Sequence, residues 1–235
     1  MQRRGLKVWG ETCPQYLVLR DSDMDRPGVE GAKFICSPPP RDGHALDAFW
    51  DDIRRGVIDV ISSDHSAYFA SGPENSKDMN GADAPFPAIP NGIPGIGARM
   101  QLLFSEGVAK GRIDLETFAR LSATNPAKIF GLYPRKGAIA PGADADLVLW
   151  DPEARDRITQ ATQQHAVDYT PYERIEVTGA PVATYLRGQL AMRDGQVLAE
   201  PGQGRFLARD PYELARPRGR HANDFDPTAA PVPPG

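Results

Sequence analysis

A short polar run, Ser62-Ser-Asp64-His65-Ser66, follows the apolar, β-branched segment Val57 to Ile61 and is the sharpest chemical signal in the sequence. A carboxylate at the end of a buried strand needs a partner such as a metal ion, a base or a hydrogen-bond network. Asp64 is therefore a candidate metal ligand or acid/base residue, with a structural hydrogen bond as the alternative. His65 is the weaker candidate of the two.

Two other segments could face a ligand. The turn Asn91-Gly-Ile-Pro-Gly95 contains glycines, which let a backbone approach a bound molecule closely, although these five residues alone favour a plain turn between a loop and a helix. Ser37 precedes the three prolines Pro38 to Pro40. Its backbone could be held rigidly toward a pocket or could belong to a simple turn.

The sequence by itself shows no complete metal site, and although Ser, His and Asp are all present, no motif supports a catalytic triad. A metal site needs three or more ligands, and the remaining histidines show neither His-x-His nor His-x-x-x-His spacing: His44, His165 and His221. There is no Gly-x-Ser-x-Gly elbow. The two cysteines, Cys13 and Cys36, cannot form a four-cysteine site, and we expect both to be small, buried thiols.

Composition excludes several classes of protein. The chain has 235 residues, of which 25% are charged and 40% hydrophobic, and its formal charge is −4, as in a soluble globular product of one or two domains. No window reaches the roughly 18 apolar residues of a membrane helix. Basic residues form no stripe for a phosphate backbone, so we expect neither nucleic acid nor membrane partners, and a cytoplasmic location.

The elements that must position these residues resemble a strand, helix, strand unit. Residues 6–19 are predicted to be extended, residues 33–36 to form a second short strand, and residues 45–53 to form an amphipathic helix that starts near Asp42. The buried strand that ends before Ser62 follows. This order is typical of an α/β barrel or a doubly wound sheet, in which loops at the carboxyl ends of the strands build the site.

The second half of the chain changes character. Residues 71–94 are predicted to be a long loop, and residues 96–109 and 115–129 to be helices, with Asp114 as a cap and Pro126 as a kink. Short strands follow at 147–150, 175–177, 182–186, 189–192 and 196–198, with hairpin turns at Arg187-Gly188 and Asp194-Gly195. The last twenty or so residues lack the apolar content to pack.

Several motifs in order closely resemble the dihydropyrimidinase and D-hydantoinase family, which are cyclic amidohydrolases of the metal-dependent amidohydrolase superfamily. The motifs are Gly10-Glu-Thr-Cys-Pro-Gln-Tyr-Leu17, Cys36-Ser-Pro-Pro39, Ser63-Asp-His65, Asn91-Gly-Ile-Pro-Gly95, Asn125-Pro-Ala-Lys-Ile-Phe-Gly-Leu132, Lys136-Gly137, Gly142-Ala-Asp-Ala-Asp-Leu147, Val167-Asp-Tyr-Thr-Pro-Tyr172 and Val177-Thr-Gly-Ala-Pro-Val182.

The resemblance implies an α/β fold: the C-terminal part of a (β/α)8 amidohydrolase barrel, with its last two strands and covering helices, followed by part of a small β-sandwich. Residues 1–135 would form the barrel portion, 136–207 the sandwich portion and 208–235 a disordered tail. The Glu-Thr-Cys-Pro-Gln-Tyr motif lies on the family's seventh strand, so we expect six strands to be encoded upstream of Met1.

The resemblance also implies a reaction, the hydrolysis of a cyclic amide such as dihydrouracil or a 5-substituted hydantoin to an N-carbamoyl amino acid. The family holds two metal ions, usually zinc, with four histidines, a carboxylated lysine and one aspartate, and only the aspartate has a counterpart here, Asp64. Asp64 would bind one metal ion and shuttle the proton. Backbone groups of Ser37 and Asn91 would hold the substrate.

The sequence leaves three hypotheses open for the whole protein. The chain could be part of such a hydrolase, inactive alone because most metal ligands are missing and not expected to retain zinc. It could be a non-catalytic scaffold of the same fold, or one half of a split enzyme whose N-terminal half is a separate chain. The family also implies a homo-oligomer, a tetramer in its complete members.

Overall fold

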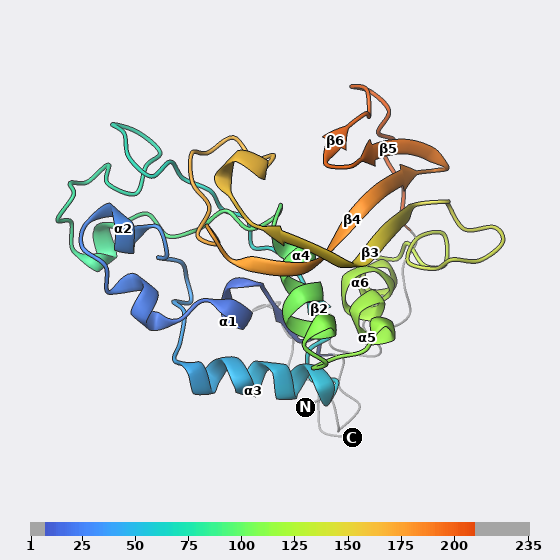
Figure 1. The fold of residues 1–235 in the computed structure, drawn as a ribbon, viewed down its shortest axis with the longest axis horizontal. Coiled ribbons are helices and arrows are strands. Elements are labelled where there is room, and N and C mark those ends of the chain that lie inside the picture. The colour runs from blue at the N-terminus through green and yellow to red at the C-terminus, as the bar shows by residue number, and fades with distance from the viewer. Residues whose placement is uncertain (1–7, 210–235) are drawn as a thin grey trace, which may run out of the picture.

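The computed structural model describes residues 8–209. Residues 210–235, which make up nearly all of the tail predicted over 208–235, lie outside the described residues. So do residues 6 and 7, the start of the predicted extended segment. In Figure 1 the first half of the chain, with its helices and long loop, lies to the left and below, and the strands of the second half cross the upper right.

The first half combines short helices with one small parallel sheet. Its elements are β1 (Glu11–Thr12), α1 (Gln15–Val18), η2 (Asp21–Met24), α2 (Val29–Ala32), α3 (Gly43–Arg54), β2 (Val60–Ile61) and η3 (Phe86–Ala88), where η denotes a 3-10 or π segment. β1 and β2 pair in parallel, with Glu11 opposite Val60 and Thr12 opposite Ile61. The predicted parallel strand before Asp64 is thus confirmed, although it is only two residues long.

The extended segment predicted over residues 6–19 is wrong beyond Thr12. Pro14 has a helical backbone (φ −54°, ψ −37°) and precedes the single turn α1. The amide of Tyr16 donates to the carbonyl of Cys13 at 3.1 Å, and that of Leu17 to the carbonyl of Pro14 at 2.9 Å. Proline begins a helical turn readily, because its ring fixes φ near the helical value. The apolar residues on either side of Pro14 do not indicate this turn in the sequence.

The strand predicted at residues 33–36 is also absent. The amide of Phe34 donates to Gly31 at 3.0 Å and that of Ile35 to Ala32 at 3.1 Å, so the segment continues the turn of α2. Because these N–H groups are used locally, no strand ladder forms through them.

Helix α3 confirms the amphipathic pattern around residues 45–53. The carboxylate of Asp42 caps it by accepting from the amide of Ala45 at 3.0 Å. Its apolar face, Leu46, Trp50 and Ile53, is buried. Trp50 and Ile53 belong to a hydrophobic core with Leu17, Ile58, Ile61, Leu103, Ile113 and Leu121. This core fixes α3 beneath the two parallel strands.

The two helices predicted after the long loop are confirmed, each with a π-helical stretch. They comprise α4 (Arg99–Leu103) with η4 (Phe104–Ala109), and α5 (Leu115–Ala119) with η5 (Arg120–Thr124) and α6 (Asn125–Ile129). Asp114 caps the second helix by accepting from the amide of Thr117 at 2.7 Å. The π-helical stretch η5 ends just before Pro126, which has no N–H to continue an α-helical ladder.

The second half forms a four-stranded antiparallel sheet in the order β3-β4-β5-β6. The strands are β3 (Leu147–Arg157), β4 (Glu176–Leu186), β5 (Gln189–Arg193) and β6 (Gln196–Val197), with the short η6 (Gln160–Thr162) after β3. The two strands predicted at 175–177 and 182–186 are one continuous strand. Both hairpin turns are confirmed, since Arg187-Gly188 and Asp194-Gly195 have positive φ at both residues, as a type I′ turn requires.

The sheet is attached to the helices through aromatic packing. Phe104 of η4 lies 4.9 Å from Trp150 of β3 and 5.5 Å from Phe118 of α5, measured between ring centroids. The hydroxyl of Ser105 accepts the backbone N–H of Thr178 on β4 at 3.0 Å. In Figure 1 α4 lies directly below the crossing of β3 and β4. The structure is therefore α/β in class, with the antiparallel sheet docked on the helices.

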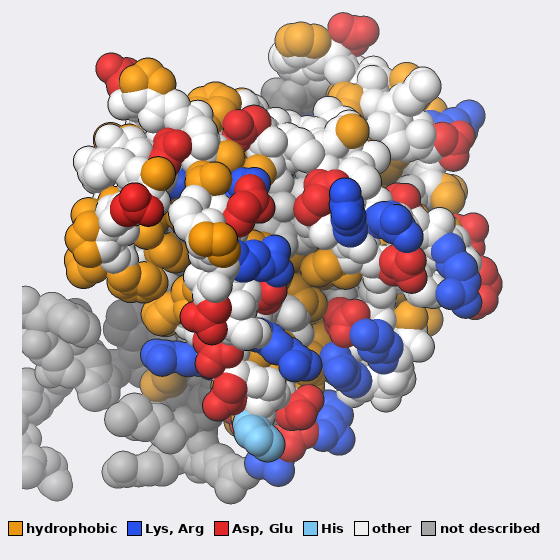
Figure 2. Space-filling view, turned by 60° about the vertical axis from the view of Figure 1, so that its left-hand side comes forward, with side chains coloured by type: hydrophobic (Ala, Val, Ile, Leu, Met, Phe, Trp, Pro, Cys, Tyr) orange, Lys and Arg blue, Asp and Glu red, His pale blue; other side chains and the backbone are white. Residues whose placement is uncertain are grey.

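The surface carries charges of both signs. In Figure 2 acidic and basic side chains lie interspersed over the visible face, with hydrophobic side chains between them. That face shows no continuous basic stripe. Among the helices of residues 8–209, none combines the length and the apolar character that crossing a bilayer demands.

The attachment of the sheet depends on one glycine, which gives a stability prediction. Gly179 on β4 has φ +89°, and a β-carbon there would overlap the Phe104 ring. We expect Gly179→Ala to lower the free energy of unfolding by about 2–4 kcal/mol, from backbone strain plus overpacking. Gly188→Ala is the control, because Gly188 has φ +79° with no atom within 4 Å. It should cost only about 1 kcal/mol. Urea unfolding of both variants measures the difference, and equal losses would contradict it.

Candidate functional site

The ends of β1 and β2 meet at one edge of the parallel sheet. Cys13 and Ser62 directly follow the paired residues, and their sulfur and hydroxyl oxygen lie 3.2 Å apart. The Ser62 hydroxyl donates to a Glu11 carboxylate oxygen at 2.6 Å. These contacts hold the two strand ends side by side and fix where the polar run after β2 begins.

Asp64 lies at this edge and is exposed. Its backbone has φ +44°, in the left-handed region that aspartate tolerates better than most side chains. Its carboxylate makes no hydrogen bond or ion pair with the described residues. β2 ends at Ile61, three residues before Asp64, so Asp64 lies exposed, and its role as a metal ligand or acid/base residue stays a prediction.

The charge of Asp64 reaches a group of buried side chains nearby. It contributes to raising the pKa of Cys13, Tyr16 and Cys36, for which burial is the main cause. Burial raises the pKa of Cys36 to about 11. Both cysteines are buried free thiols, as expected from the sequence. Asp64 thus contributes to the electrostatics of the segment that carries Cys36 and, next to it, Ser37.

His65 fixes the backbone turn after the long loop. Its Nδ1 accepts the N–H groups of Gly95 at 3.1 Å and Ile96 at 3.3 Å, which puts the ring proton of the neutral imidazole on Nε2. The backbone of His65 also forms a parallel bridge with Ile93. The ring centroids of His65 and His165 lie 5.9 Å apart. Burial is the main cause that lowers the pKa of His165, and the neighbouring His65 lowers it further. His65 therefore orients the turn that begins at Asn91.

Ser37 and Asn91, predicted from the resemblance to bind substrate, are in contact. The Ser37 hydroxyl donates to the side-chain oxygen of Asn91 at 3.1 Å, across 54 positions of sequence. Both residues are exposed. The turn after Asn91 also packs closely on Ser66, which requires a glycine at position 92, because its φ is +128° and a β-carbon there would overlap the carbonyl oxygen of Ser66.

Three further side chains stabilise the same region. The hydroxyl of Tyr16 donates to the carbonyl of Pro38 at 2.9 Å, and Cys36 approaches that carbonyl at 3.4 Å. The guanidinium of Arg99 donates to the carbonyl of Ile61 at 2.9 Å, which ties α4 to the end of β2. Burial lowers the pKa of Arg99.

Nothing in the sequence selects Lys77 as a site residue. It lies in the long loop and is almost fully buried, with 1% of its surface exposed. Its ammonium group donates to the carbonyls of Ile35 at 2.8 Å and Pro90 at 2.7 Å. No pattern in the surrounding polar residues distinguishes this lysine from a surface one, so only the structure could find it.

The described residues do not hold a metal ion by themselves. Within residues 8–209 no three His, Cys, Asp or Glu side chains come together in an arrangement suited to a metal. Asp64 is one exposed carboxylate, and a two-metal centre needs several ligands acting together. His65 and His165 lie near each other, but His65 already uses Nδ1 for the backbone.

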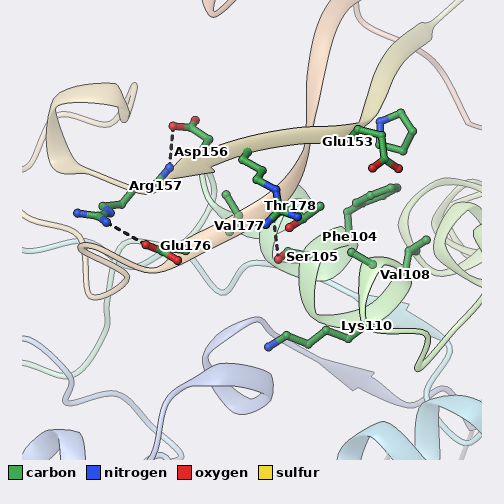
Figure 3. A pocket seen from close by; sticks show the side chains of 13 residues that line it. Phe104, Ser105, Val108, Lys110, Glu153, Asp156, Arg157, Glu176, Val177 and Thr178 are labelled. Carbon is green, nitrogen blue, oxygen red and sulfur yellow. Dashed lines mark hydrogen bonds and ion pairs between the residues drawn. The ribbon is translucent and has the colours of Figure 1, made fainter.

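A concavity lies elsewhere, between η4 and the sheet (Figure 3). It encloses about 960 Å³ and is lined by Phe104, Ser105, Lys110, Glu153, Arg157 and Glu176, among others. Arg157 and Glu176 pair across its margin at 2.9 Å. It shares no residue with the cluster around Asp64, Ser37 and Asn91.

Comparison with known proteins gives the class. Residues 28–191 match the amidohydrolase family, and the chain belongs to it. A D-hydantoinase of Geobacillus stearothermophilus is 44% identical over 211 residues, which are 90% of this chain and 44% of the relative. The expected membership of the dihydropyrimidinase and D-hydantoinase group is confirmed.

Solved structures agree with that assignment. A dihydropyrimidinase from Brevibacillus agri superposes with a TM-score of 0.85 at 40% identity, over 92% of this chain and 45% of that one. An L-hydantoinase (dihydropyrimidinase) from Arthrobacter aurescens superposes with a TM-score of 0.79 at 32% identity, over 88% of this chain and 44% of that one. The chain thus spans slightly less than half the length of the relatives it matches.

The buried thiols give a prediction for reactivity. Because the thiolate is the reactive form and burial raises both thiol pKa values, Cys13 and Cys36 should resist iodoacetamide at neutral pH in the folded protein and react after denaturation. Labelling of Cys36 should rise as the pH approaches 11. Mass spectrometry of tryptic peptides follows each cysteine, with Cys36→Ala as the control for Cys13. Rapid labelling of Cys36 in the folded protein at neutral pH would contradict this prediction.

Proposed function

We propose that this chain supplies the proton-transferring carboxylate and the substrate-holding backbone of a cyclic-amide hydrolase. The substrate class is a dihydropyrimidine or 5-substituted hydantoin, opened to an N-carbamoyl amino acid. The single observation that carries the proposal is the contact of Ser37 with Asn91 in a turn whose Ile93 is bridged to His65, the residue next to Asp64. Family membership and the printed names of the relatives support the choice of substrate.

The sheet edge suits this role because its functional groups come from three separate segments. Asp64 follows β2, Ser37 follows the turn after α2, and Asn91 ends the long loop. The contact between Ser37 and Asn91 brings the latter two together, and the His65–Ile93 bridge joins Asn91's turn to Asp64's strand. We infer that the two parallel strands belong to the last part of a (β/α)8 barrel, whose sites lie at this end of the strands.

The residues present can perform two parts of the reaction. Main-chain groups at Ser37 and Asn91 would hold the amide edge of the ring and set its carbonyl carbon near Asp64. Asp64 would accept the proton of the attacking water and then donate it to the departing ring nitrogen, so that one carboxylate acts as base and then as acid. Its exposure leaves both oxygens available for these transfers.

A metal ion does not fit the described residues alone, since Asp64 is one ligand where the resemblance implies a set. We propose that the other ligands come from outside this chain, either from an upstream part of the same protein or from a separate chain. The reaction of the whole protein then needs both parts, and this chain by itself should show no hydrolysis.

A hybrid protein tests the proposal. The matching C-terminal part of the Geobacillus stearothermophilus D-hydantoinase would be replaced by this chain, so that the relative supplies the upstream part. We expect the hybrid to hydrolyse hydantoin or dihydrouracil. Asp64→Asn should lower kcat/KM at least about a hundredfold, because a general acid or base contributes that much or more.

Asp47→Asn is the matched control, since Asp47 is an exposed carboxylate on α3. This variant should leave kcat/KM unchanged. Circular dichroism and thermal melting would establish that every variant is folded. A folded hybrid that hydrolyses neither substrate, or one in which Asp64→Asn is as active as the unsubstituted hybrid, would refute the proposed function.

A further inference from the structure

Lys77 is a buried cation in a segment of otherwise irregular structure. Only 1% of its surface is exposed, whereas lysine is rarely buried unless it is paired. Burying an ammonium group costs free energy that its contacts must offset. The position of Lys77 therefore requires a structural or functional reason.

The contacts of Lys77 are with carbonyl oxygens and an aromatic ring. Its ammonium group donates to the carbonyls of Ile35 at 2.8 Å and Pro90 at 2.7 Å, and lies 5.5 Å from the centroid of the Tyr68 ring. It forms no ion pair with a carboxylate in residues 8–209. Desolvation lowers the pKa of Lys77 to about 8, and the nearby Cys36 opposes this shift. The lysine thus binds backbone and does not neutralise an acid.

The two carbonyls belong to the two segments that carry the candidate substrate-binding residues. Ile35 lies two residues before Ser37, and Pro90 directly precedes Asn91. The carbonyl of Ile35 also accepts the N–H of Gly92 at 3.1 Å. Lys77 and Gly92 therefore share one acceptor, and together they join the two segments at the level of the backbone.

These bonds fix the peptide units on both sides of Asn91. In a trans peptide the C=O and the N–H point in opposite directions. Because the carbonyl of Pro90 points to Lys77, the N–H of Asn91 points away from it. Because the N–H of Gly92 points to Ile35, the carbonyl of Asn91 points away from Ile35. Neither main-chain group of Asn91 is hydrogen-bonded to the described residues, so both are left for a ligand.

We propose that Lys77 is a positioning residue that orients the main-chain N–H and C=O of Asn91 toward the cyclic amide. The inference rests on the proposed function and deepens it, since it names what holds the substrate-binding backbone in place. Lys77 touches neither substrate nor the reacting atoms, and acts through the carbonyls of Ile35 and Pro90.

The first test uses the 235-residue chain and needs no activity. Lys77→Met keeps the length of the side chain and removes its donors. We expect hydrogen exchange of the Gly92 amide to become at least about tenfold faster, which corresponds to about 1.4 kcal/mol, while the Leu102 amide of α4 stays unchanged. Lys77→Arg keeps the donors and should restore part of the protection. Lys110→Met removes an exposed lysine directly after η4 and is the control.

The second test uses the hybrid hydrolase. If Asn91 holds the substrate in both the ground state and the transition state, Lys77→Met should raise KM about tenfold and change kcat little. An unsubstituted hybrid without activity would count against the proposed function, and the exchange experiment would still decide the role of Lys77.

Three results would overturn the positioning role. The first is unchanged exchange at Gly92 in Lys77→Met, and the second is an equal acceleration at Gly92 and Leu102, which indicates a general loss of stability. If Lys77→Met does not fold, NMR of the unsubstituted chain replaces it. Couplings across hydrogen bonds from the Lys77 ammonium nitrogen to the carbonyl carbons of Ile35 and Pro90 are then expected, and their absence is the third.

Discussion

The parallel pairing of β1 with β2 is the constraint on which the candidate site depends. Only two residues of each strand pair, yet this pairing places Cys13 and Ser62 at the same edge, where their side chains meet at 3.2 Å. The polar run after β2 begins at that contact. The core beneath, with Ile53 and Ile61 fully buried, keeps the strands in register. Asp64 can therefore be exposed and still have a defined position.

The second requirement is that loop backbone be as well fixed as strand backbone. A main-chain N–H or C=O can hold a ligand only if its peptide unit has one orientation, and loops do not supply this by themselves. Here a buried cation, Lys77, and a histidine, His65, each bind two backbone groups of the segments around Ser37 and Asn91. Burying the ammonium group of Lys77 costs more free energy than leaving a lysine at the surface. In return, the backbone around the site is held in one orientation.

Much of the fold could be predicted from the sequence where a periodic pattern or a turn motif was present. Helix α3, with its cap at Asp42, and the hairpin turn at Asp194-Gly195 depend on local rules that the sequence displays. The α1 turn and the missing strand at residues 33–36 could not be predicted, because their short turns use local hydrogen bonds that apolar composition does not reveal. Asp64 stood out through the abrupt change from apolar to polar residues. Lys77 did not, because its partners are carbonyl oxygens, which every residue has.

The central claim is that Ser37, Asp64 and Asn91 form one binding site for a cyclic amide. The most direct measurement is a titration of the isotopically labelled chain with hydantoin, followed by the chemical shifts of its backbone amides. The account predicts that the shifts that change lie at Ser37 and at the turn from Asn91 to Gly92, with a smaller change at Asp64. Changes confined to the cavity between η4 and the sheet, or an absence of change around Asn91 at millimolar hydantoin, would contradict it.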